Sequence, residues 1–232
     1  MAAALTAQIP VLLRGESEPI NRWLSEPSLS RLGSYVAVIA VGMAAFGAAI
    51  GIWRAPTQAL YNAIKFPLVI LLVAIGNSLL NGMLAPLLGL DLRLRQSFLA
   101  ILMSFTIASA ILGAFSPVLA FVVWNTPPRG EASDAYSFLL LVLVLMIAFA
   151  GVTANVRLLE LLRRLSSSRL VAQRVLIAWL AGNLFLGSQL CWIMRPFVGS
   201  PGLPVQFLRP DAFRGNFFEG VFWALKSLFT AS

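Results

Sequence analysis

Few residues in this chain could do chemistry. It has no histidine, and its single cysteine, Cys191, lies inside an apolar run. Zinc, copper and haem sites and Cys/His catalytic pairs need more of these side chains, so we expect no metal and no cofactor. The carboxylates stand in loops or at the ends of apolar runs, without the spacing of a paired-acid or phosphate-binding site. The sequence therefore predicts a protein that is not an enzyme.

Amide side chains form the first candidate site. Asn77 and Asn81 are four residues apart and so share one face of a helix, and Asn183 and Gln189 in a later apolar run extend the set. Amides are costly in lipid unless another helix supplies hydrogen bonds. This polar face is either a contact between helices or the lining of a solute path, and the spacing does not choose between the two.

A Pro-rich segment from Arg195 to Gly220 forms the second candidate site. Four prolines within fifteen residues restrict the chain, which predicts an ordered loop packed over other elements. We expect an interaction surface or a structural cap, and a transferase site using Asp211 or Glu219 is a further alternative. The candidate contact residues are Arg195, Pro196, Phe197, Arg209 and Arg214.

A basic segment, residues 157–174, is the third candidate. It reads RLLELLRRLSSSRLVAQR, with leucines at helical spacing, and predicts a helix lying against anionic lipid headgroups. A surface for a soluble partner is the alternative. The expected lipid contacts are Arg157, Arg163, Arg164, Arg169 and Arg174.

The elements that must position these residues are transmembrane helices. Hydrophobic residues make up 59% of the 232 residues and charged residues only 11%, whereas soluble domains are about 25% charged. Apolar runs long enough to cross a bilayer predict an all-α polytopic helix bundle. The expected spans are residues 32–53, 66–90, 96–124, 135–156 and 175–194, within a bundle of residues 32–194. Residues 1–31 form an N-terminal segment, and 195–232 an external loop followed by a short amphipathic or sixth helix over 216–229.

Basic residues near the span ends predict the orientation. Ten lie on the side of the N-terminus, against Arg54, Lys65 and Arg129 in the opposite loops. The C-terminal tail on that opposite side adds four more, which weaken the asymmetry without reversing it: Arg195, Arg209, Arg214 and Lys226. Arginine and lysine are enriched in cytoplasmic loops, so we expect a cytoplasmic N-terminus. The same rule accounts for the net charge of +8 without nucleic-acid binding. The preference for arginine over lysine favours a bacterial inner membrane.

The pair Gly47 and Gly51 forms a GxxxG match in the first span. Such pairs let two helix backbones approach closely. In a run so rich in glycine and alanine, we expect packing within the chain rather than dimerisation.

Two strings carry a resemblance to known proteins. Residues 63–68, AIKFPL, and the segment from Gly187 through Arg195-Pro196-Phe197 to Gly202 resemble a family of uncharacterised bacterial polytopic membrane proteins. The plan of five spans is also similar to Yip1-type proteins, which implies a role in membrane organisation. We expect a non-enzymatic scaffold or subunit of a membrane complex, whose partners are the bilayer, anionic lipids on the cytoplasmic side, and other membrane proteins or a second copy. The alternative is a channel or facilitator for a small uncharged or anionic solute.

Overall fold

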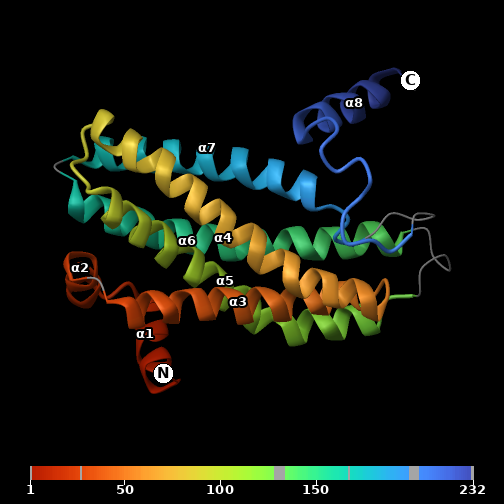
Figure 1. Ribbon diagram of the computed structural model, residues 1–232, viewed down its shortest axis with the longest axis horizontal. Helices are drawn as coiled ribbons and strands as arrows, with labels where there is room; N and C mark the ends of the chain where they lie inside the picture. The colour runs from red at the N-terminus through yellow and green to blue at the C-terminus, as the bar shows by residue number, and fades with distance from the viewer. Residues whose placement is uncertain (1, 27, 128–133, 167, 199–203, 231–232) are drawn as a thin grey trace.

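The chain folds into helices. The computed structural model describes residues 2–26, 28–127, 134–166, 168–198 and 204–230 (Figure 1). Within this part there is no strand, and the elements are α1 (Ala2–Arg14), α2 (Ser17–Ser25), α3 (Leu29–Gly51), α4 (Pro56–Leu87), α5 (Leu94–Trp124), α6 (Ala135–Leu165), α7 (Arg169–Met194) and α8 (Phe217–Thr230).

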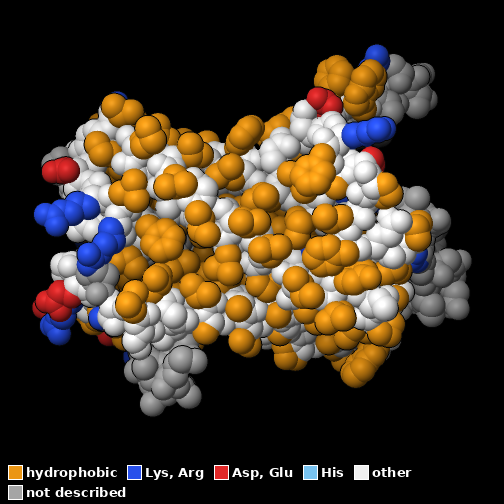
Figure 2. All heavy atoms as spheres, in the orientation of Figure 1, with side chains coloured by type: hydrophobic (Ala, Val, Ile, Leu, Met, Phe, Trp, Pro, Cys, Tyr) orange, Lys and Arg blue, Asp and Glu red, His pale blue; other side chains and the backbone are white. Residues whose placement is uncertain are grey.

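Helices α3 to α7 have the length and apolar composition needed to cross a membrane. Large apolar side chains along them are exposed, among them Val41 (71%), Leu145 (61%) and Leu184 (71%). Figure 2 shows this apolar surface as a belt across the middle of the molecule, with charged side chains gathered at its ends. A surface of this kind is solvated by lipid rather than by water. The protein is therefore a multi-pass membrane protein, and the predicted all-α bundle with five spans is confirmed.

The spans form a ring in the order α3, α5, α6, α7, α4, and α4 also packs on α5. Glycines bring α3 close to α4. A Cβ atom at Gly47 would lie 2.6 Å from the carbonyl oxygen of Asn62, and one at Gly51 would lie 2.6 Å from the Cα atom of Ala59. The GxxxG pair thus serves packing within the chain, as predicted.

Helix α4 begins ten residues before the predicted span. Pro56 occupies the first turn, where its missing N–H costs no helical hydrogen bond. The predicted span began after Lys65 and so placed it in a loop. The structure places Lys65 in the helix instead. It lies two and a half turns inside α4 and is fully buried.

The basic segment 157–174 is not one surface helix. Helix α6 continues to Leu165 and α7 begins at Arg169, so the segment forms the two arms of a tight turn. Serine side chains explain the break: Ser166 Oγ donates to the carbonyl of Ser168, and Ser168 Oγ accepts from the N–H of Leu170. Serine at such a position caps the new helix and replaces continued helical hydrogen bonds.

The short helices lie at opposite ends of the bundle (Figure 1). Helices α1 and α2 contact α5 near the α6–α7 turn, and α8 contacts the far end of α7. Helix α8 has 14 residues and is about 21 Å long, shorter than the roughly 30 Å of a hydrocarbon core. It is anchored by the stacked rings of Phe218 and Phe185, whose centroids are 5.9 Å apart.

Candidate functional site

Three polar residues of α4 hold the loop that follows α7. Gln58, Asn62 and Lys65 are spaced four and three residues apart, so they share one face of the helix, and all three are fully buried. Pro196 and Phe197 present their carbonyl oxygens to this face. We call these five residues the loop clamp.

The clamp satisfies both loop carbonyls. Lys65 Nζ donates to Pro196 O at 2.8 Å, and Asn62 Nδ2 donates to Phe197 O at 2.8 Å. Gln58 Nε2 lies 3.1 Å from Pro196 O and 3.0 Å from Phe197 O, and it also reaches Asn62 Oδ1 at 2.9 Å. A buried carbonyl without a partner is costly, so these bonds fix the start of the loop on the bundle.

Lys65 has aromatic rings rather than a carboxylate as its other neighbours. Its Nζ atom lies 5.6 Å from the ring centroid of Phe197 and 5.1 Å from that of Phe207. Within the described residues no Asp or Glu forms an ion pair with it. Ring faces attract cations, and this attraction grows when water is excluded. The buried ammonium is therefore stabilised by one carbonyl and two rings.

Arg195 joins the end of α7 to the later part of the loop. Its Nη1 atom donates to Trp192 O at 2.8 Å, and Nη2 lies 3.1 Å from Asp211 Oδ2. Its guanidinium lies 3.9 Å from the Trp192 ring centroid, and Trp192 Nε1 donates to Arg214 O at 3.2 Å. The described parts of the predicted loop are thus held at both ends, and its residues 199–203 lie outside the described residues.

A cavity of about 500 Å³ lies beneath this loop. It has lining residues on both α4 and α6, which contact each other little if at all in the described part of the chain. Its walls are mostly apolar, and the basic side chains on it are Arg195 and Arg209. Of the predicted loop contacts, Arg195, Pro196, Phe197 and Arg209 line the cavity, whereas Arg214 is exposed outside it.

The predicted polar face is only partly assembled. Asn77 Nδ2 donates to Asn183 Oδ1 and also lies 3.4 Å from Trp179 O, so these residues join α4 to α7. Gln189 is six residues beyond Asn183, which turns it about 120° away on the helix. Gln189 therefore does not belong to this face.

Asn81 is buried but unpartnered. Its side chain is fully buried, and neither its Oδ1 nor its Nδ2 atom has a hydrogen-bond partner among the described residues. Asn77 Oδ1 and Trp179 Nε1, on the same α4 and α7 helices, are also without partners. Buried polar groups that only join two helices are normally hydrogen-bonded to each other. The unpartnered atoms of Asn77, Asn81 and Trp179 are therefore not explained by contact between α4 and α7 alone.

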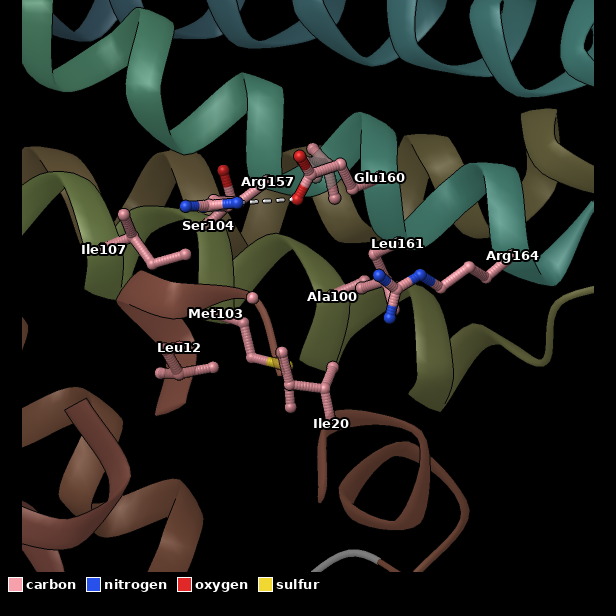
Figure 3. A pocket seen from close by; sticks show the side chains of 12 residues that line it. Leu12, Ile20, Ala100, Met103, Ser104, Ile107, Arg157, Glu160, Leu161 and Arg164 are labelled. Atoms are coloured by element: carbon pink, nitrogen blue, oxygen red, sulfur yellow. Dashed lines mark hydrogen bonds and ion pairs between the residues drawn. The ribbon is translucent and has the colours of Figure 1, made fainter. Parts of the chain in front are cut away.

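The predicted lipid-contacting arginines divide into two kinds. Four are exposed at the α6–α7 turn and fit the prediction in position: Arg163, Arg164, Arg169 and Arg174. Arg157 differs, because its Nη1 atom pairs with Glu160 Oε2 at 2.9 Å. Together with Arg164 it lines a small cavity between the N-terminal helices, α5 and α6 (Figure 3). Leu12 and Ile20 close that cavity from α1 and α2. Arg157 thus lies where the N-terminal helices meet α6.

The sequence interpretation missed the clamp on α4. Its signal was present, because Gln58, Asn62 and Lys65 have the spacing of one helical face. That signal required the helix to begin at Pro56, and the rise in hydropathy begins only at Phe66.

Comparisons with known proteins add no relative. No family model, no curated protein and no solved structure matches the chain. The resemblance to bacterial polytopic proteins and to Yip1-type proteins therefore stays a prediction. Residues 199–202 of the string that carries it lie outside the described residues.

Proposed function

We propose that the protein is a non-enzymatic subunit or scaffold of a membrane complex, and that its fixed loop is the surface that binds a neighbouring protein. The loop clamp carries this proposal. An ordered loop binds with less loss of conformational freedom than a free one, and here four donor contacts from α4 order it.

Exposed aromatic side chains give this surface a binding chemistry. Phe213 in the loop is 81% exposed, and Phe222 and Trp223 on α8 are 61% and 60% exposed. Aromatic side chains are enriched where proteins bind each other, and clusters of them rarely stay uncovered outside the hydrocarbon. A partner with an apolar patch fits this end of the bundle.

We place the loop end on the side of a bacterial inner membrane that faces away from the cytoplasm, and the N-terminus in the cytoplasm. Because Lys65 lies inside the bundle, Arg54 and Arg129 are the only basic residues of the α3–α4 and α5–α6 connections. Arg129 lies outside the described residues. The opposite end keeps the exposed arginines of the α6–α7 turn. This distribution supports a cytoplasmic N-terminus by the positive-inside rule.

Native mass spectrometry of the protein extracted in mild detergent tests the proposal. We expect a defined complex with a second protein, lost in Phe213→Ser and kept in Leu29→Ser. Leu29 is 87% exposed at the opposite end of the bundle, which makes it the matched control. Recovery of the wild-type chain alone would contradict the proposal.

The second candidate function is a facilitator for a small uncharged or anionic solute. The unpartnered amide of Asn81 and the neighbouring unpartnered atoms on α4 and α7 favour it, because polar groups at membrane depth commonly line a solute path. Flux into liposomes that is reduced by Asn81→Leu would support this function.

A further inference from the structure

The cavity beneath the loop takes lining side chains from all five spans. Met43 comes from α3, Val69 from α4, Leu112 from α5, Leu143 from α6 and Cys191 from α7. Because these helices form a ring, a space that all of them line lies inside the ring rather than on one of its faces. Its volume of about 500 Å³ falls within the roughly 300–1,000 Å³ of small-molecule sites in proteins. The cavity therefore has the place and the size of a ligand site.

The walls of this cavity suit a hydrocarbon chain. Met43, Val69 and Leu112 are buried, and they turn toward the cavity side chains that cannot form hydrogen bonds. Such walls give a water molecule few of the hydrogen bonds that hold water inside a protein. An empty space of this size would leave the same side chains without packing contacts. A hydrocarbon chain supplies those contacts and displaces weakly held water at a gain, so access of water to the cavity does not disfavour it.

The charged groups at the cavity already have partners. Arg195 donates to Trp192 O and pairs with Asp211 Oδ2. Arg209 also interacts with another group of the protein. An anionic headgroup would have to displace these partners or lose its water without replacement, and both are costly. An uncharged ligand disturbs none of these contacts.

The cavity reaches the lipid-facing surface of the bundle. Ile147 on α6 and Cys191 on α7 line the cavity, and both are exposed. Both residues belong to apolar spans, so hydrocarbon surrounds them in a membrane. A chain that is already in the bilayer can therefore enter at these residues without passing through water.

We propose that this cavity binds the single hydrocarbon chain of an uncharged amphiphile from the membrane, such as a monoacylglycerol. A lipid with two chains is larger than the molecules that sites of this volume enclose. The site goes beyond the proposed binding of a protein partner and does not depend on it.

Phe197 connects this site to the loop clamp. Its ring lines the cavity and lies 5.2 Å from the ring of Phe66, centroid to centroid, and its carbonyl oxygen accepts from Asn62. A chain in the cavity therefore packs against a residue that the clamp holds. Monoacylglycerol should for this reason slow hydrogen exchange in residues 204–216.

Photolabelling of the full-length protein in phosphatidylcholine vesicles tests the site. The probe is a monoacylglycerol with a photoreactive diazirine in its acyl chain, and mass spectrometry identifies the labelled residues. We expect label on Met43 and Leu112 that saturates with probe concentration, and label on the exposed Val41 and Leu145 that does not saturate. Absence of label on Met43 and Leu112 would overturn the proposal. Label there that does not saturate would also overturn it, because bulk lipid chains label in this way.

Competition in the same vesicles tests the headgroup. Unlabelled monoacylglycerol should suppress the saturable label, and lysophosphatidic acid with the same acyl chain should need about a tenfold higher concentration. Equal or stronger competition by the anionic lipid would show that a phosphate recruits Arg195 or Arg209. The assignment of an uncharged ligand would then be wrong.

A pair of variants on α6 tests the point of entry. Ile147→Trp places an indole where the cavity reaches lipid and should abolish the saturable label. Val144→Trp, three residues earlier, is the control, because Val144 is exposed and is not among the residues that line the cavity. Equal labelling of the two variants contradicts the site. The labelling and competition experiments use the wild-type chain, so they decide the question even if Ile147→Trp does not fold.

Discussion

Replacing Asn81 by leucine should stabilise the protein if the bundle interior is dry. The Asn81 side chain is fully buried and neither end of its amide has a partner in the described structure. An unsatisfied buried amide costs about 1–3 kcal/mol, and leucine has the same number and branching of side-chain heavy atoms as asparagine. We therefore expect Asn81→Leu to raise the free energy of unfolding by about 1–3 kcal/mol. At roughly 2–4 °C per kcal/mol for a chain of this length, the unfolding midpoint should rise by several degrees.

Asn62 provides a matched control on the same helix. It is equally buried, but its Nδ2 atom donates to Phe197 O at 2.8 Å. Asn62→Leu removes this bond and should lower the free energy of unfolding by about 1–3 kcal/mol. Thermal unfolding of both variants in one detergent measures the difference. If Asn81→Leu is destabilised as much as Asn62→Leu, the reasoning is refuted: the amide then has a partner such as water or solute, and the facilitator gains support.

Two further changes test the packing and the clamp. Gly47→Ala should destabilise the protein by about 1–3 kcal/mol, because the new Cβ would lie 2.6 Å from the Asn62 carbonyl oxygen; Gly151→Ala, which meets nothing within 4 Å, should be close to neutral in the same thermal assay. Lys65→Met should leave Pro196 O without its cation and speed hydrogen exchange in residues 204–216 by roughly tenfold or more. Unchanged exchange would mean that the clamp does not order the loop.

The class of fold was predictable because it depends on composition over long stretches. Twenty apolar residues can be placed only in hydrocarbon, whichever residues they are, so the spans followed directly from the sequence. The GxxxG pair was read correctly for a local reason, since small residues mark close helix contacts. The predicted polar face was correct for Asn77 and Asn183, which bind each other, but not for Gln189. Which side chains meet depends on the rotation of each helix about its axis, and hydropathy does not encode that rotation.

The loop clamp could not be derived in the same way. Its acceptors are backbone carbonyls of Pro196 and Phe197, and a carbonyl carries no sequence signature. The ends of α4 and α6 were also misplaced, because each helix continues past the apolar run that predicts it. Lys65 shows the reason: a carbonyl and two rings let a charged residue lie inside the bundle, where hydropathy alone excludes it.

The clamp also imposes an order on biosynthesis. Lys65 and Pro196 are 131 residues apart in the chain, and three further spans separate them. During synthesis the ammonium of Lys65 has no carbonyl to bind until α7 has inserted and the loop has emerged. Until then each partly made bundle exposes a charge to lipid, at a cost of several kcal/mol. A chain that ends before the loop therefore lacks the carbonyl that Lys65 binds in the complete protein.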